Sequence, residues 1–322
     1  MNTEKKPLLI LTGPTAVGKT ALSIQLAKAV GGEIVSADSM QVYRHMDIGS
    51  AKVTEKEMEG IPHYLIDVLD PQDDFNVATF QTLARQAMDE ICSHGNIPII
   101  TGGTGFYIQA LLYDIDFKEN NEKNPIRKEL EQLAKELGSK APGTLHEKLS
   151  HIDPEAARQI HANNIKRVIR AIEYFEQTGE KISEHNEEMH QKESPYNFLY
   201  YVLTRDRKTL YERIDKRVDI MIANGLVKEI EKLKAMGCHR GQTSMQGLGY
   251  KEILDYLDGS CTLDEAVYIL KRDTRHFAKR QLTWFRRERD VRWLDLDRYQ
   301  GNTDLILKDI LKDCEEKRIV LK

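Results

Sequence analysis

A glycine-rich loop near the start of the chain limits the possible folds more than any other feature. Leu8 to Leu11 predict a short buried strand, and the spacing of apolar residues from Ala21 to Ala27 predicts a helix. The loop between them fits the pattern G-x-x-x-x-G-K-S/T in the strand-loop-helix context that this pattern requires. It consists of Gly13, Pro14, Thr15, Ala16, Val17, Gly18, Lys19 and Thr20.

The residue types in this loop suit the binding of a di- or triphosphate. Gly13 and Gly18 allow the backbone to curl so that successive N–H groups point at an anion. The start of the helix adds unpaired N–H donors and the positive end of its dipole. Lys19 is expected to reach the terminal phosphates, and Thr20 to offer its hydroxyl to Mg²⁺. An ordinary glycine-rich turn would not need both of these residues.

Composition limits the class of protein and its environment. The 322 residues are 40% hydrophobic and 30% charged, which is ordinary for a globular protein, and no apolar run approaches the length of a membrane span. The N-terminal residues lack the apolar core of a signal peptide, so a cytoplasmic protein without a membrane partner is expected. The four cysteines are far apart and predict free thiols rather than structural zinc: Cys92, Cys238, Cys261 and Cys314.

A second strand, Glu33–Asp38, and a third, Ile97–Thr101, extend the alternation of strands and helices. This alternation predicts a parallel sheet whose ligands gather at the carboxyl ends of the strands. Asp38 then either faces the phosphate loop or caps the following turn, and position alone does not decide between the two. The loop Gly102–Gly105 brings Thr104 to the same edge. The buried strand before it does not end in the Asp that a nucleotide hydrolase uses for its metal.

The remaining pattern predicts an α/β protein with a P-loop NTPase-like parallel sheet flanked by helices. Residues 117–195 read as an all-helical insertion between core segments 1–116 and 196–322. The other predicted core elements are strands at His63–Val68, Tyr196–Thr204 and Val291–Leu296, helices at Asp73–Ala87, Arg205–Met236 and Leu263–Arg289, and a surface helix in the tail.

Basic residues concentrate in two places. Lys271–Arg289 holds eight Lys/Arg against two acids, net +6 within a chain of net charge −4, which predicts a surface for a nucleic-acid backbone. Arg213 and Arg217 stand one helical turn apart and could either clamp phosphate or pair with acidic neighbours such as Glu212 and Asp215. A shorter basic run at Lys166–Arg170 is, by itself, more typical of a solvated helix face.

Six segments occur together and in a fixed order: GPTAVGKT, SADSMQVYRHMDIGSAK, PIITGGTGFY, NNIKRVIRAIE, SMQGLGYKE and KRQLTWFRR. With them the chain resembles the tRNA dimethylallyltransferase (isopentenyl-tRNA transferase) family in its bacterial form. The resemblance runs from about Leu8 to Trp293. The zinc finger of eukaryotic relatives has no counterpart, in keeping with the absence of cysteine pairs.

The resemblance implies transfer of a dimethylallyl group from dimethylallyl diphosphate to N6 of the adenine just 3′ of a tRNA anticodon. In that reaction the phosphate loop would hold a diphosphate leaving group, with Mg²⁺ as cofactor. Asp38 would be the general base, Thr104 would lie near the reacting centre and Arg217 would help hold diphosphate. These three are the expected catalytic residues.

The resemblance also implies contacts with the tRNA anticodon stem-loop, and a monomer is expected. The residues that match its tRNA-contacting segments are Asp38, Ser39, Met40, Gln41, Arg127, Lys166, Arg167, Val168, Ile169, Arg170, Gly247, Gly249, Tyr250, Lys279, Arg280 and Arg286.

Two functions from other classes remain open at the level of sequence. A small-molecule kinase would use the phosphate loop for ATP but leaves the basic stretch Lys271–Arg289 without a role. A non-catalytic RNA-binding module gated by nucleotide gives Asp38 no role.

Overall fold

The computed structural model describes residues 5–117 and 125–319. The chain divides into two units. Residues 1–112 and 195–322 form the first, here the P-loop unit, and residues 113–194 form the second, here the helical unit. The predicted insertion, residues 117–195, covers nearly the same part of the chain as the helical unit.

A six-stranded sheet forms the centre of the P-loop unit, and all its paired strands run parallel, which confirms the predicted fold class. The strand order is β3-β2-β4-β1-β5-β6. The strands span β1 Lys6–Thr12, β2 Gly32–Ala37, β3 His63–Tyr64, β4 Ile97–Gly102, β5 Tyr196–Thr204 and β6 Val291–Asp295. Strand β1 lies between β4 and β5, so the loop that follows it emerges at the middle of the sheet.

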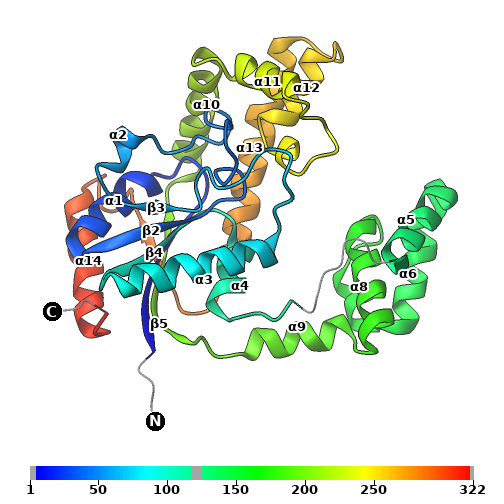
Figure 1. The fold of residues 1–322 in the computed structure, drawn as a ribbon, viewed down its shortest axis with the longest axis horizontal. Coiled ribbons are helices and arrows are strands. Elements are labelled where there is room, and N and C mark those ends of the chain that lie inside the picture. The colour runs from blue at the N-terminus through cyan, green and yellow to red at the C-terminus, as the bar shows by residue number, and fades with distance from the viewer. Residues whose placement is uncertain (1–4, 118–124, 320–322) are drawn as a thin grey trace. The chain divides into compact units, whose positions relative to one another are not determined.

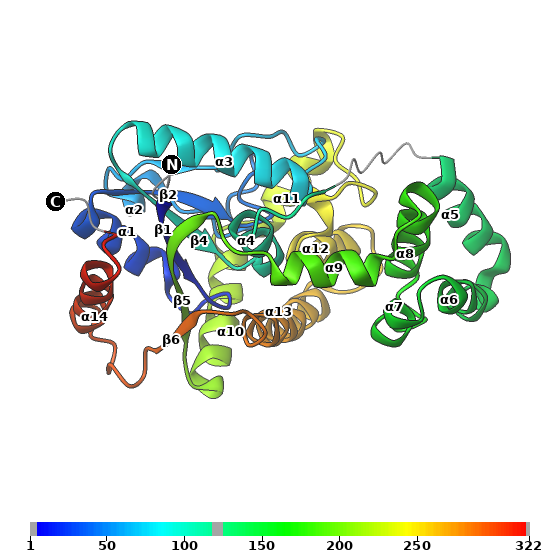
Figure 2. The same ribbon diagram turned by 90° about the horizontal axis from the view of Figure 1, so that it is seen from below.

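Helices cover both faces of this sheet, with α3 on one side and α1 and α14 on the other (Figures 1 and 2). The helices of the P-loop unit are α1 Lys19–Val30, α2 Glu55–Met58, α3 Val77–Ser93, α4 Gly105–Leu112, α10 Arg207–Ala223, α11 Leu226–Ala235, α12 Tyr250–Leu257, α13 Leu263–Phe285 and α14 Thr303–Glu316, with a 3₁₀ turn at Ser244–Gln246.

Alternation along β1 distributes its side chains between the two faces. Leu9 and Leu11 join a buried cluster with residues of α1, α10 and α14, whereas Leu8 and Ile10 are equally buried and, by strand alternation, face the opposite side. The tail helix α14 contributes Ile306 to this cluster, so one side of the predicted surface helix belongs to the core.

The helix predicted at Asp73–Ala87 begins and ends later, at Val77–Ser93, where Asn76 caps its first turn. Two further predicted elements are interrupted, and the backbone shows why. The strand expected at His63–Val68 ends at Tyr64 because Leu65 and Asp67 adopt positive φ of 63° and 55°, which no strand accommodates. The single helix expected from Arg205 to Met236 is two helices. Gly225, with φ of 98°, separates α10 from α11.

The helical unit has its own core. Its helices span α5 Pro125–Leu137, α6 Ala141–Ile152, α7 Pro154–Gln159, α8 Ile165–Thr178 and α9 Ile182–Gln191, with a 3₁₀ turn at Gly138–Lys140. Leu130, Leu145, Leu149 and Ile172 pack together at its centre. Among the helices within the described residues, none is both long enough and apolar enough to cross a membrane.

Candidate active site

The loop after β1 has the backbone shape of an anion cradle. Gly13 and Gly18 adopt φ of 152° and 115°, and a Cβ at Gly13 would approach the carbonyl oxygen of Leu203 to 2.7 Å. Ala16 also has positive φ, 61°, which is unfavourable for a residue with a side chain. Gly18 caps α1, so Lys19 is the first residue of the helix. Positive φ at Gly13, Ala16 and Gly18 allows the loop to curl tightly, as an anion-binding loop requires.

Lys19 is held against the loop it follows. Its Nζ donates to the carbonyl oxygens of Gly13 at 3.0 Å and Pro14 at 2.9 Å. Burial, together with the nearby charge of Arg217, lowers the pKa of Lys19 to about 8, while Asp38 opposes this shift. An anion bound beside Lys19 would stabilise the charged form of this side chain.

The two arginines of α10 both contact the phosphate loop. Arg213 donates from Nε to the carbonyl oxygen of Ala16 at 2.8 Å, and Arg217 lies with Nη1 3.4 Å from Thr15 Oγ1. The alternative pairing with Asp215 does not form, because Asp215 binds Arg275 of α13 instead. Burial lowers the pKa of the Arg217 guanidinium below its ordinary value, and Asp38 counteracts this. Arg205, which precedes α10, donates from Nε to the carbonyl oxygen of Val17 at 3.0 Å. Four cationic side chains thus border this loop: Lys19, Arg205, Arg213 and Arg217.

Gln281 of α13 locks the phosphate loop to the second glycine loop, a role that sequence reasoning missed. Its Oε1 accepts from the backbone N–H of Thr15, and its Nε2 donates to the carbonyl oxygen of Gly103, both at 2.9 Å. The side chain is 6% exposed, and a Cβ at Gly103 would overlap it. In the sequence, the one feature that distinguishes Gln281 is an uncharged amide at the centre of the basic segment Lys271–Arg289.

We expect Gln281→Leu to weaken the binding of inorganic diphosphate ~3–10-fold, because two buried backbone groups lose their partner and the loop loses its anchor. Isothermal titration with inorganic diphosphate measures this. Gln159→Leu makes the same change at an exposed amide in the helical unit and should leave the affinity unchanged. Equal affinities for wild type and Gln281→Leu would contradict the assigned role.

Asp38 directly follows β2, and it both caps the following turn and lies in a pocket beside the phosphate loop. Its Oδ1 accepts from the backbone N–H of Met40 at 2.8 Å and of Gln41 at 3.3 Å, so it caps the following turn. It also lines a pocket of about 430 Å³ together with Thr15, Thr104 and Arg217. The cap fixes the carboxylate in one orientation while leaving it accessible from the pocket.

This pocket, here the central pocket, is lined by three groups of residues. Thr15 of the phosphate loop and Gly103, which Gln281 links, form the first group together with Gln281. The second group comes from two segments, residues 39–50 and residues 243–251: Ser39, Met40, Gly49, Ser50, Thr243, Gln246, Gly247, Leu248 and Lys251. The third group consists of apolar side chains of α10 and α13: Ile214, Val218, Met221, Leu270 and Phe277. An apolar group attached to a phosphate therefore has a matching surface.

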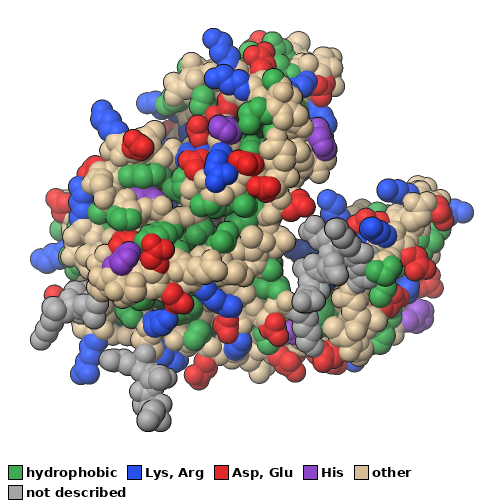
Figure 3. Space-filling model, viewed as in Figure 1, with side chains coloured by type: hydrophobic (Ala, Val, Ile, Leu, Met, Phe, Trp, Pro, Cys, Tyr) green, Lys and Arg blue, Asp and Glu red, His purple; other side chains and the backbone are tan. Residues whose placement is uncertain are grey.

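The basic helix α13 is charged more unevenly than its sequence predicts. In its first half Lys271 pairs with Asp219 at 2.6 Å and Arg275 with Asp215 at 2.5 Å, both acids from α10. Arg272 pairs with its neighbour Asp273. The net charge counted along the sequence therefore overstates the positive charge of the first part of the segment, because acids from α10 neutralise Lys271 and Arg275. The effective basic surface is the second half. Over the face shown in Figure 3, charges of both signs are interspersed.

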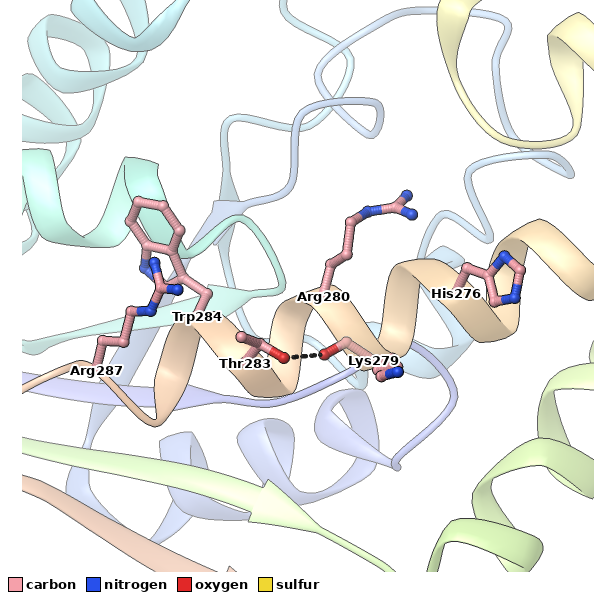
Figure 4. A pocket seen from close by; sticks show the side chains of 6 residues that line it. All are labelled: His276, Lys279, Arg280, Thr283, Trp284 and Arg287. Carbon is pink, nitrogen blue, oxygen red and sulfur yellow. Dashed lines mark hydrogen bonds between the residues drawn. The ribbon is translucent and has the colours of Figure 1, made fainter. Parts of the chain in front are cut away.

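The second half of α13 and Arg287, which follows its end, line a shallow hollow of about 380 Å³ (Figure 4). His276, Lys279, Arg280, Thr283, Trp284 and Arg287 form its surface. Lys279, Arg280 and Arg286, all predicted to contact RNA, are exposed. Arg280 also lines the central pocket, so the hollow and the pocket meet at this side chain. Trp284 packs so closely on Gly105 that any larger residue there would overlap it.

Other residues that are predicted to contact RNA instead support neighbouring segments or lie buried. Gln41 Nε2 lies 3.3 Å from the carbonyl oxygen of Ala51, so it supports the adjacent turn. Gly247 and Gly249 are buried, and Gly247 borders Met40. Tyr250 is fully buried, so the prediction that its side chain contacts RNA is wrong for this conformation.

The basic run Lys166–Arg170 in the helical unit also contains buried residues. Val168 and Ile169 are 0% and 5% exposed, so their side chains support the helix and cannot contact RNA in this conformation. Arg127 and Arg170 both bind the buried carboxylate of Glu173, at 2.7 Å and 3.1 Å. Lys166 and Arg167 are exposed, and an RNA contact by these two side chains remains a prediction.

The donor atoms suit a metal ion that arrives with its substrate. Thr20 is exposed in the first turn of α1 and offers one hydroxyl oxygen. Across residues 5–117 and 125–319, no three His, Cys, Asp or Glu side chains gather as metal ligands. Mg²⁺ is commonly held by few protein groups together with phosphate oxygens and water, so this site fits a diphosphate-bound Mg²⁺.

The parallel sheet, the glycine loop after its central strand and the lysine at the start of α1 define a P-loop protein with a pocket beside the phosphate loop. Residues 41–288 match the family model described as IPP transferase. The chain is 60% identical over 98% of its length to tRNA dimethylallyltransferase of Lachnoclostridium phytofermentans, covering 99% of that protein. It is 53% identical to the Acetivibrio thermocellus protein of the same name, over 93% of this chain and 95% of that one. The chain therefore belongs to the IPP transferase family.

Solved structures agree with this assignment. The full-length tRNA isopentenylpyrophosphate transferase from Bacillus halodurans superposes with a TM-score of 0.73 at 46% identity, with 98% of each chain covered. A eukaryotic dimethylallyltransferase described as acting on tRNA gives 0.80 at 29% identity, covering 98% of this chain and 81% of that one. The small-molecule kinase and the non-catalytic RNA-binding module are thereby set aside in favour of a prenyltransferase.

Proposed function

We propose that this chain transfers the dimethylallyl group from dimethylallyl diphosphate to N6 of the adenine directly 3′ of the anticodon in tRNA, with release of diphosphate. The observation that carries the proposal is the central pocket, which Asp38 and Thr104 line together with Arg217 and with Thr15 of the phosphate loop. A base, an anion cradle and an apolar wall in one cavity are what prenyl transfer to an amine requires.

The donor is bound by its diphosphate. The phosphate loop, Lys19 and Arg217 surround the anion, and the five-carbon chain lies along Val218 and Phe277. Charge accumulates on the leaving oxygen as the bond between C1 and oxygen breaks, and these cations stabilise it. Thr20 would hold the diphosphate-bound Mg²⁺, which supplies further neutralisation of the leaving group.

The acceptor amine needs help because its lone pair is delocalised into the adenine ring. The N6 nitrogen forms a bond to C1 as the C1–O bond breaks, and Asp38 takes the proton that N6 loses. The N–H groups of Met40 and Gln41 hold this carboxylate in place, so it meets the amine without a change of rotamer. Thr104, which directly precedes α4, lines the same pocket, and its hydroxyl is suited to hydrogen-bond the reacting groups.

The tRNA approaches along α13. Lys279, Arg280 and Arg286 contact phosphates, and Arg280 stands where the shallow hollow joins the central pocket. The adenine must leave its stack to reach the donor, as bases do in other enzymes that modify them. We propose further that the protein acts as a monomer, on tRNA in the cytoplasm.

A prenyl-transfer assay tests the proposal. Radiolabelled dimethylallyl diphosphate, Mg²⁺ and unmodified tRNA are incubated with the protein, and label in tRNA is counted. A parallel reaction contains labelled ATP instead of the donor, and a third contains EDTA. We expect label from the prenyl donor alone, and a loss of ~10-fold or more with EDTA, restored by Mg²⁺. Absence of prenyl transfer under all conditions would overturn the proposal.

A further inference from the structure

Glu229 of α11 is a buried carboxylate that the proposed chemistry does not use. It is 9% exposed, and its oxygens accept four hydrogen bonds from neutral donors. Oε2 accepts from the backbone N–H groups of Asp47 at 2.9 Å and Ile48 at 2.7 Å. Oε1 accepts from the N–H of Gly49 and the hydroxyl of Tyr250, both at 3.0 Å. Three consecutive N–H groups that converge on one carboxylate fix the backbone between residues 47 and 49.

Tyr250 completes this anchor. A Cβ at Gly49 would lie 2.5 Å from the Tyr250 ring, so the ring packs directly on the glycine. Burial and the adjacent Glu229 raise the pKa of the Tyr250 phenol, which keeps it protonated and able to donate. Glu229 is therefore saturated from two sides, by the turn and by the first residue of α12.

The turn that Glu229 holds is part of the central pocket. Gly49 and Ser50 line it, as do Ser39 and Met40, which directly follow Asp38. Gly247 and Lys251, close to Tyr250 in the chain, line the same pocket. One buried carboxylate thus joins two segments that line the pocket, through hydrogen bonds to residues 47–49 and Tyr250.

We infer that Glu229 is a positioning residue that shapes the acceptor side of the pocket, where the adenine is received, without contributing to the donor side. This inference rests on the proposed function. An isosteric amide cannot replace the carboxylate, because glutamine offers one acceptor oxygen and turns an NH₂ group toward N–H donors.

The test separates the two sides of the pocket. Glu229→Gln should lower kcat/KM for tRNA ~10-fold or more, because at least one hydrogen bond to a charged group is lost and each ~1.4 kcal/mol is a factor of ten. The dissociation constant for dimethylallyl diphosphate, measured by equilibrium dialysis without tRNA, should stay within ~2-fold, since no donor-side contact changes. Tyr250→Phe removes a single donor and should give a smaller loss in the same direction.

Glu231→Gln, on the exposed face of the same helix, is the matched control and should behave as wild type. Unchanged kcat/KM for tRNA in Glu229→Gln would overturn the inference, and so would a parallel loss of donor binding, which indicates general destabilisation. A wild-type protein that fails to prenylate tRNA in the same experiment would instead reject the proposed function, so the two failures are distinguishable.

Discussion

Replacing Asp38 with asparagine should lower kcat for prenyl transfer by ~10²–10⁴-fold, the range expected when a general base is removed. The amide retains an oxygen for the N–H groups of Met40 and Gln41, so the turn after β2 should keep its shape. The KM values for tRNA and donor should change by less than ~3-fold, because the missing group acts mainly in the transition state.

Steady-state kinetics with separately varied tRNA and donor measure this effect. Asp304→Asn, at an exposed position in the first turn of α14, serves as the control and should retain wild-type kcat. If Asp38→Asn kept more than a tenth of wild-type kcat, Asp38 would be a structural cap and the proton would leave by another route.

Substituting Lys19 with methionine should reduce kcat/KM for dimethylallyl diphosphate by ~10²–10³-fold, as expected on removal of a cation that faces developing negative charge. The wild-type enzyme should show a related dependence on pH. The pKa of Lys19 is lowered to about 8, so the charged form that binds the diphosphate predominates below that pH and is lost above it. kcat/KM for the donor should therefore fall as the pH rises above about 8.

The pH profile separates Lys19 from other titrating groups. Once the diphosphate is bound its charge keeps the lysine protonated, so kcat at saturating donor should not show the same decline. Lys19→Arg retains its charge throughout this range and should lose the decline, whatever its absolute rate. An identical decline in Lys19→Met would assign the titration to a different residue.

Local sequence carried enough information for the parts of the site that lie within a few residues of one another. The phosphate loop is defined by spacing and by the conformations that Gly13 and Gly18 allow. The position of Asp38 follows from the rule that parallel strands bring their carboxyl ends together. The break at Gly225 was missed, since the apolar spacing continues through it.

Pairing between residues distant in the chain accounts for the other differences between the predicted and the observed site. Gln281 contacts Thr15 across 266 positions, and nothing local to either residue indicates this bond. The basic helix looked uniformly charged because Asp215 and Asp219 belong to another element. Tyr250 sits in a segment that matches RNA-contacting motifs, yet its burial is decided by Gly49 and Glu229. Each error concerns a partner that is distant along the chain.

The chain leaves the P-loop unit after α4 and re-enters it at β5, and the strands that flank this excursion, β4 and β5, both adjoin β1. Every residue of the central pocket lies outside the excursion. The lining of the pocket is therefore supplied by two segments of the chain that are separated by the whole helical unit. Substitutions within residues 113–194 can alter the core and surface of that unit without replacing any residue that lines the pocket.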